Sequence, residues 1–104
     1  MPRFDVYANP YTDERAHTPY VLDIQNDHLG PMGSRVVIPL RTPRGFGPPA
    51  RGLNPLIEVD GKPVLLDTAS IASVNASSLK RIVARASNHR AEIAEALDTL
   101  FGAY

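Results

Sequence analysis

The sequence predicts one mainly β domain with α content (α+β), built as an antiparallel sheet or small barrel with one C-terminal α-helix. All ten prolines lie between Pro2 and Pro63. Proline has no N–H to donate, so this part of the chain favours short strands joined by stiff turns. Residues 87–104 contain no proline and instead repeat apolar side chains at helical spacing. Strands followed by a terminal helix are typical of folds in which the helix lies at one end of an antiparallel sheet.

The length and composition limit the class of protein. A chain of 104 residues is long enough for one domain, spanning 1–104, with a single modest core. Eleven basic and eleven acidic residues cancel, which does not indicate a general binder of nucleic acid or membrane surfaces. The lack of cysteine excludes a disulfide scaffold, thiolate catalysis and a cysteine zinc site. No apolar run has the length of a signal peptide or membrane span, so we expect a soluble cytoplasmic protein.

Short alternating or apolar segments mark the expected strands. Residues 35–40 are apolar on both faces, which predicts a central strand, and Pro39 must then lie where no N–H is needed. The turn at 30–33 joins this segment to the strand before it and predicts an antiparallel pair. A further short apolar segment covers 69–74. The expected strands are 4–7, 20–25, 35–40, 56–59 and 62–67.

Asp60-Gly61 lies between two of these strands and predicts a hairpin. A type I′ turn needs positive φ at both central residues, and Asp-Gly is among the pairs that adopt it. Residues 77–84 resemble one or two helical turns, capped by Ser77 or Ser78, that lead into the final helix.

The final helix is the longest predicted element. Ser87 and Asn88 are both suitable N-caps, and Gly102 suits the C-terminus. Phe101 and Tyr104 lie beside that glycine, where they either pack back onto the core or are presented to a partner. The expected inward face comprises His89, Ile93, Ala96, Leu97 and Leu100.

Signals for catalysis are weak. There is no Gly-x-Ser-x-Gly motif, no glycine-rich phosphate loop followed by lysine and no His-Glu-x-x-His, and nothing indicates a metal or other cofactor. His17 with Arg41, Arg44 or Arg51 could supply acid/base groups and a phosphate clamp for RNA cleavage, although their spacing does not require it. The three arginines flank or lie within the Gly/Pro-rich loop 42–54, which is either mobile or a binding loop.

Lys80, Arg81 and Arg85 form a short basic face just before the acidic final helix. Ordinary surface charge is the simpler interpretation of this face, and a nucleic-acid site is the alternative.

Several short motifs occur in an order and spacing that resemble the CcdB family, the toxin component of a bacterial toxin–antitoxin pair. The resemblance runs from Phe4 almost to the end of the chain. The matching motifs are Phe4-Asp5-Val6-Tyr7, Asp23-Ile24-Gln25-Asn26-Asp27, Arg35-Val36-Val37-Ile38-Pro39-Leu40, Leu53-Asn54-Pro55, Ala72-Ser73-Val74 and Ser87-Asn88-His89-Arg90.

The resemblance implies an SH3-like barrel or antiparallel sheet with a C-terminal helix, and a homodimer. It implies a toxin that is not an enzyme, that binds DNA gyrase through the A-type subunit of that enzyme and that traps the cleaved gyrase–DNA complex. It also implies a cognate antitoxin whose disordered C-terminal segment removes the toxin. No cofactor, membrane or sequence-specific nucleic-acid binding is implied.

The resemblance also assigns site residues. Arg44 and Arg51 match arginines of the flexible loop that contacts the antitoxin. The gyrase-contacting positions fall on Asp98, Phe101, Gly102, Ala103, Tyr104, His28 and Leu29.

The chain departs from the family at these positions. The family ends its last helix with Trp-Gly-Ile, whereas this chain has no tryptophan. Asp98 replaces an asparagine, and His28 and Leu29 replace two isoleucines. Because tryptophan often dominates a buried interface, its loss predicts weakened or lost gyrase poisoning. Two alternatives therefore stay open: a barrel-type endoribonuclease, and a toxin-derived protein that only binds an antitoxin.

Overall fold

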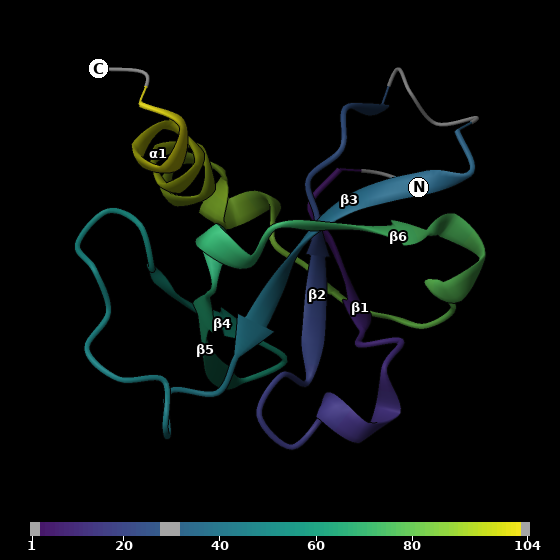
Figure 1. The fold of residues 1–104 in the computed structure, drawn as a ribbon, viewed down its shortest axis with the longest axis horizontal. Helices are drawn as coiled ribbons and strands as arrows, with labels where there is room; N and C mark the ends of the chain where they lie inside the picture. The colour runs from purple at the N-terminus through teal and green to yellow at the C-terminus, as the bar shows by residue number, and fades with distance from the viewer. Residues whose placement is uncertain (1–2, 28–31, 103–104) are drawn as a thin grey trace.

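A computed structural model describes residues 3–27 and 32–102 (Figure 1). Within these ranges the chain forms a seven-stranded antiparallel sheet followed by one α-helix, α1 (Arg90–Phe101). The strands are β1 (Asp5–Ala8), β2 (Tyr20–Asp23), β3 (Ser34–Arg41), β4 (Leu56–Val59), β5 (Lys62–Leu66), β6 (Ala72–Asn75) and β7 (Ile82–Arg85). Short 3₁₀ turns are η1 (Thr12–Glu14), η3 (Thr68–Ser70), η4 (Ala76–Ser78) and η5 (Ser87–His89).

The central strand is β3, as the sequence predicts. The strand order is β4-β5-β3-β2-β1-β7, with β6 also paired to β3. On the side away from β2, β3 pairs with β6 from Ser34 to Val37 and with β5 from Leu40 to Arg41. Pro39 lies between these two stretches, opposite Val21 of β2. The proline therefore occupies the point where β3 changes partner and no ladder N–H is required.

The sheet curls into an SH3-like half-barrel, which confirms the predicted fold class. The two end strands, β4 and β7, come into contact because the sheet turns back on itself. Figure 1 shows α1 across one end of this curl, above the β4–β5 hairpin. The antiparallel pairing of β2 with β3 is also confirmed. Gly30 and Pro31 of the turn expected between them lie outside the described residues.

The main core fills the inside of the curl. Ile93 and Ala96 of α1 are fully buried in it. Each large apolar side chain buried in this way contributes about 1.5–3 kcal/mol to stability. The sheet supplies most of the remaining core side chains, among them Phe4, Val6, Leu22, Ile38, Leu40, Ile57, Val59, Val64 and Leu66.

The opposite face of β1, β2 and β3 is buried as well. A second cluster there consists of Tyr7, Val21, Val37, Val74 and Leu79. Strands buried on both faces carry apolar residues at successive positions, which explains the continuous apolar run of β3.

The hairpin predicted at Asp60-Gly61 is confirmed. Asp60 and Gly61 have φ values of 52° and 77°, the positive pair that a type I′ turn requires. Strand β4 pairs with β5 from Leu56↔Leu65 to Val59↔Lys62.

The start of the final helix differs from the prediction. The α-helix begins at Arg90, and neither Ser87 nor Asn88 forms a side-chain cap, because both lie in the 3₁₀ turn η5. The physical reason is the preceding residue. Ala86 is buried and donates its N–H to the Phe4 carbonyl at 2.8 Å, so pairing with the sheet sets the backbone direction there. The prediction that Gly102 ends the helix is confirmed.

The helical turns predicted over 77–84 are mostly wrong. Only η4 is helical, and the Ser78 hydroxyl donates to the Asn75 carbonyl instead of capping a helix. Residues Ile82–Arg85 form strand β7, which pairs antiparallel with β1. The edge of β1 pairs with Ile82, Ala84 and Arg85, and the register shifts at Val83, so tertiary pairing overrides the local helical pattern.

None of the helices in the described part of the chain is long and apolar enough to cross a membrane.

Candidate partner-binding site

The C-terminal end of α1 presents an aromatic side chain to solvent. Phe101 is the last residue of the helix and is 68% exposed. Gly102 follows in the left-handed conformation (φ 72°, ψ 44°), and its N–H donates to the Asp98 carbonyl at 2.9 Å. Glycine adopts this conformation without the penalty that a Cβ imposes, so the helix ends immediately after Phe101. Asp98, one turn earlier, is also exposed.

Of the two interpretations left open for Phe101, its exposure supports presentation to a partner. Ala103, Tyr104, His28 and Leu29 of the expected contact set lie outside the described residues. Asp98, Phe101 and Gly102 therefore make up the part of that set whose positions are described.

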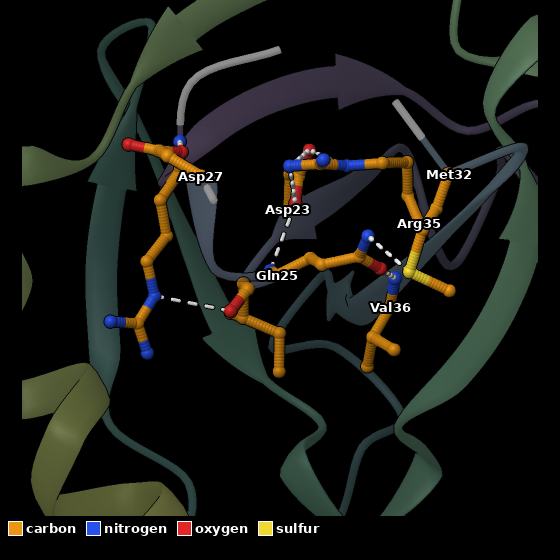
Figure 2. Close-up of polar contacts among 8 residues, drawn as sticks. Asp23, Gln25, Asp27, Met32, Arg35 and Val36 are labelled. Atoms are coloured by element: carbon orange, nitrogen blue, oxygen red, sulfur yellow. Dashed lines mark hydrogen bonds and ion pairs between the residues drawn. The ribbon is translucent and has the colours of Figure 1, made fainter. Parts of the chain in front are cut away.

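The flanks of residues 28–31 are held by a buried polar network at the start of β3 (Figure 2). Arg35 Nε donates to Asp23 Oδ2 at 2.9 Å and Arg35 Nη2 donates to Asp23 Oδ1 at 3.0 Å. Both side chains are fully buried. The bidentate ion pair fixes β3 against β2 close to the point where the chain leaves the sheet.

Further hydrogen bonds extend this network to both sides of the segment. The Gln25 N–H donates to Asp23 Oδ1, and Gln25 Oε1 accepts from the Val36 N–H, each at 3.0 Å. Gln25 Nε2 also approaches Met32 Sδ at 4.0 Å (Figure 2). These contacts hold the sheet-side ends of the connection on which His28 and Leu29 lie.

Arg3 anchors the other flank. Its N–H donates to Asp27 Oδ1 at 2.6 Å, and its Nε donates to the Ile24 carbonyl at 3.1 Å. Its guanidinium also lies 4.8 Å from the centre of the Phe4 ring, and Arg90 of α1 lies 5.6 Å from the same ring. The start of α1 and the end of β2 thus meet around one aromatic side chain.

The sequence carried no signal for the conformation of Phe4. Its φ is 73°, in a region that phenylalanine rarely adopts. The conformation is held from both sides, because the Phe4 N–H donates to the Asp23 carbonyl at 2.7 Å and the Phe4 carbonyl accepts from Ala86. Long-range partners such as these cannot be deduced from local propensity. The ion pair had a weak signal, since Asp23 and Arg35 each occupy a strand segment that is otherwise apolar.

Two groups near this network have shifted proton affinities. Burial raises the pKa of the Asp5 carboxyl, Arg85 opposes the shift and Asp23 adds to it. Asp5 is 1% exposed, and Arg85 Nε lies 3.8 Å from its Oδ1. Burial also raises the pKa of the Tyr7 hydroxyl, and the charges of Asp5 and Asp23 add to that shift.

The second predicted contact region is the loop between β3 and β4. Arg44 and Arg51 are both exposed, and neither forms a hydrogen bond or ion pair with a described residue. The loop is tied down near its end, where Asn54 Nδ2 donates to the Leu66 carbonyl at 2.9 Å. Both guanidinium groups are therefore available to an acidic partner.

This loop lies beside α1. A Cβ added to Gly52 would be 3.3 Å from the Thr99 hydroxyl oxygen. Thr99 lies between Asp98 and Phe101, so the chain next to Arg51 approaches the helix close to its exposed end. The structure thus brings the Arg51 end of the loop close to the C-terminal part of α1, although the two are distant in the sequence.

Of the set considered for RNA cleavage, the structure brings His17 beside the start of the arginine loop, because the Thr42 N–H donates to the His17 carbonyl at 3.0 Å. His17 Nδ1 lies 2.6 Å from the Thr18 hydroxyl, and Arg41 Nη1 donates to Asp67 Oδ2 at 3.4 Å. No hydrogen bond joins His17 to Arg41, Arg44 or Arg51, all of which the structure describes. Across residues 3–27 and 32–102, no group of three or more His, Asp or Glu side chains could hold a metal ion.

The half-barrel with its terminal helix defines a small SH3-like domain with an exposed aromatic ring at the helix end and exposed arginines in the loop between β3 and β4. The family model described as CcdB protein matches residues 3–102 of this chain. The match covers nearly the whole chain, so the protein belongs to the CcdB family, and membership implies the toxin of a toxin–antitoxin pair. A search of curated proteins found no match to this chain.

Proposed function

We propose that this protein is a non-enzymatic toxin that binds the A-type subunit of DNA gyrase and traps the cleaved gyrase–DNA complex, and that a cognate antitoxin neutralises it. Family membership supports the toxin class. The observation that carries the choice of surface is the exposed Phe101 at the end of α1.

An aromatic side chain left in water at a helix end is poorly explained by folding. Ile93 and Ala96 already hold α1 on the core, so Phe101 adds little to stability where it lies. Buried in a pocket of a partner, the same ring can contribute about 2 kcal/mol or more to binding. Asp98, one turn away, adds a charge that can fix the orientation of such a contact.

The antitoxin is assigned to the neighbouring loop. Arg44 and Arg51 present exposed guanidinium groups, which suit the carboxylates of a disordered acidic tail. Because Gly52 lies against Thr99, a tail bound along this loop reaches the surface around Phe101. A tail bound there would compete with gyrase for the surface around Phe101, and this competition would explain how the antitoxin neutralises the toxin.

A homodimer is part of the same proposal, with the interface near the base of the final helix. Small sheet domains have limited cores, and several large apolar side chains are exposed in the described chain. Met32, next to residues 28–31, is 49% exposed. Light scattering at micromolar concentration should give twice the chain mass of 11.3 kDa. A mass equal to one chain would contradict the dimer.

One second candidate has a specific observation in its favour. The chain contains no tryptophan, so the large indole of the family is missing from the helix end, where either Gly102 or, if one residue is lost, Phe101 takes its place. A protein that binds the antitoxin without poisoning gyrase would fit this difference. Incubation of purified protein with gyrase and supercoiled plasmid separates the two, because a poison yields linear DNA after detergent and protease treatment.

The matched variants for that assay are Phe101→Ala and Glu95→Ala. Both change exposed residues of α1, but only the first removes the aromatic ring. We expect Phe101→Ala to require at least about tenfold more protein for the same linear DNA, and Glu95→Ala to match the wild type. No linear DNA from the wild type would favour the antitoxin-binding candidate. Degradation of added RNA by the pure protein would favour the endoribonuclease.

A further inference from the structure

A basic cavity lies on a part of the molecule that the proposed function does not use. It has a volume of about 510 Å³ and is formed between η1 and the chain that runs from η4 to β7. These two segments meet at the end of β1 (Figure 1). Three cationic and three hydroxyl side chains line it: Arg15, Lys80, Arg81, Thr12, Ser77 and Ser78.

The fold brings these residues together through backbone contacts. The Ala8 N–H donates to the Arg81 carbonyl at 3.0 Å, which fixes Arg81 against β1. Leu79 is buried in the second apolar cluster, and this packing holds the neighbouring Lys80 backbone against the sheet. Sequence positions more than sixty residues apart therefore line the same cavity.

Arg15 is held in place by a buried asparagine. Asn9 is 1% exposed; its Oδ1 accepts from the Tyr11 N–H and its Nδ2 donates to the Thr18 carbonyl. Arg15 Nε donates to the Asn9 carbonyl at 2.7 Å. One edge of the guanidinium is thereby fixed to a neutral group, which leaves its positive charge uncompensated beside the cavity.

The charged side chains that line the cavity are all positive, although Asp13 and Glu14 follow Thr12 on η1. None of the described residues that line it is acidic. Neither Lys80 nor Arg81 forms an ion pair with a described residue, whereas Arg85 of the same basic run lies beside Asp5. The nearby Glu14 lines a separate, smaller cavity with Asn9 and Tyr11. Three positive charges held close together repel one another, and an anion that enters the cavity relieves this repulsion.

We propose that this cavity binds a phosphate oxyanion, supplied either by a small phosphorylated molecule or by the backbone of a nucleic acid. A phosphate group carries more oxygen acceptors than a carboxylate, and three cations with the hydroxyl donors of Thr12 and Ser77 can satisfy them. The hydroxyls of Thr12 and Ser77 add hydrogen bonds that a simple patch of surface lysines does not offer, whereas the Ser78 hydroxyl already donates to the Asn75 carbonyl. None of the lining residues belongs to α1 or to the loop 42–54, so this site stands apart from the proposed gyrase and antitoxin contacts.

The first test is an NMR titration of the full chain with inorganic phosphate, at constant ionic strength maintained with chloride. Backbone amide shifts should concentrate at residues 12–15 and 77–81. Arg81→Gln and Lys80→Gln should each weaken phosphate binding about tenfold, the loss expected for one charge-assisted hydrogen bond. Lys62→Gln removes one positive charge from an exposed position on β5 and should bind phosphate as the wild type does. Circular dichroism of each variant verifies folding.

A second arm distinguishes the two sources of the phosphate. A single-stranded thymidine oligonucleotide should bind more tightly than inorganic phosphate and compete with it if the source is a nucleic-acid backbone. Each cation removed from the cavity should then lower the salt dependence of log K by about 0.7. An oligonucleotide that binds no more tightly than inorganic phosphate assigns the site to a small phosphorylated molecule.

Three outcomes would overturn the proposal. The first is a set of amide shifts scattered over the surface, and the second is a loss of binding in Lys62→Gln as large as that in Arg81→Gln. The third is a polyglutamate peptide that binds this cavity more tightly than either phosphate probe, which would assign it to an acidic protein segment instead. A protein that binds phosphate but is not toxic would contradict only the proposed function, because phosphate binding and toxicity are measured separately.

Discussion

Arg35 and Asp23 form a bidentate ion pair, at 2.9 and 3.0 Å, in which both side chains are completely buried. Such a pair carries a large desolvation penalty, so its presence does not by itself indicate extra stability. Its position is informative, because it joins β2 to β3 beside the connection that contains His28 and Leu29. The pair holds two strands in one register at the base of a predicted partner contact.

Removing one member of this pair should be far more damaging than removing both. Arg35→Met leaves the Asp23 carboxylate buried without its counter-charge and should lower the free energy of unfolding by about 3–5 kcal/mol. The double variant Asp23→Leu/Arg35→Met should lose less than Arg35→Met alone. Urea unfolding followed by circular dichroism measures both. If both variants lose the same free energy of unfolding, the buried, unpaired Asp23 carboxylate is not the cause of the loss in Arg35→Met.

The end of α1 should separate toxicity from stability. Phe101→Ala removes an exposed ring, so the free energy of unfolding should change by less than about 0.5 kcal/mol while growth arrest is lost on induction in a sensitive host. Ile93→Ala, on the buried face of the same helix, should instead cost about 2–5 kcal/mol. Thermal melting and a growth assay of both variants provide the comparison. A large drop in melting temperature for Phe101→Ala would mean that the ring is packed inward, and undiminished growth arrest would place the active surface elsewhere.

The loop arginines should affect antitoxin binding without affecting the fold. Changing Arg44 and Arg51 together to Ala removes two exposed guanidinium groups, and it should weaken binding of the antitoxin tail by about tenfold or more, since each charge-assisted hydrogen bond contributes about 1.5–3 kcal/mol. Calorimetry at physiological salt measures the affinity. Lys62→Ala, which removes a charge from an exposed position on β5, is the control. Unchanged affinity in the double variant would refute the assignment of this loop.

Asp5 should make the fold less stable as the pH rises. Burial raises its pKa above the ordinary value of 3.8, so between that value and the raised one the folded protein binds more protons than the unfolded chain. The free energy of unfolding therefore falls as the pH rises through this window, and the loss is complete above the raised pKa. Asp5→Asn has no such titration, so its stability relative to the wild type should improve with rising pH and then level off. Urea titrations from about pH 3.5 to 7 test this. A difference that does not vary with pH would contradict it.

The central strand, the hairpin and the inward face of the helix could be predicted from local patterns. Asp60-Gly61 identified a type I′ turn because few residue pairs adopt two consecutive positive φ values at low cost. The continuous apolar run of β3 identified a central strand. Pro39 is compatible with that strand because it lies between the β6 and β5 pairings, where β3 needs no backbone N–H donor. The inward face of α1 followed from the spacing of Ile93 and Ala96. Each of these signals depends on neighbours a few residues apart, which is why the sequence alone was sufficient.

The remaining features depend on contacts between distant segments. Residues 82–85 become a strand because they pair with the edge of β1, and α1 begins at Arg90 because Ala86 bonds to Phe4. The sequence named Arg51, Asp98 and Phe101 as contact residues through the family resemblance, but only the approach of Gly52 to Thr99 places them on neighbouring parts of one surface. Likewise, Lys80 and Arg81 resemble ordinary surface charge until the fold brings Arg15 to the same cavity. Local propensity determines turns, strands and helix faces, which depend on residues close together in the sequence. The pairing of β7 with β1 and the meeting of Arg15 with Lys80 and Arg81 arise only when the curled sheet brings distant residues together.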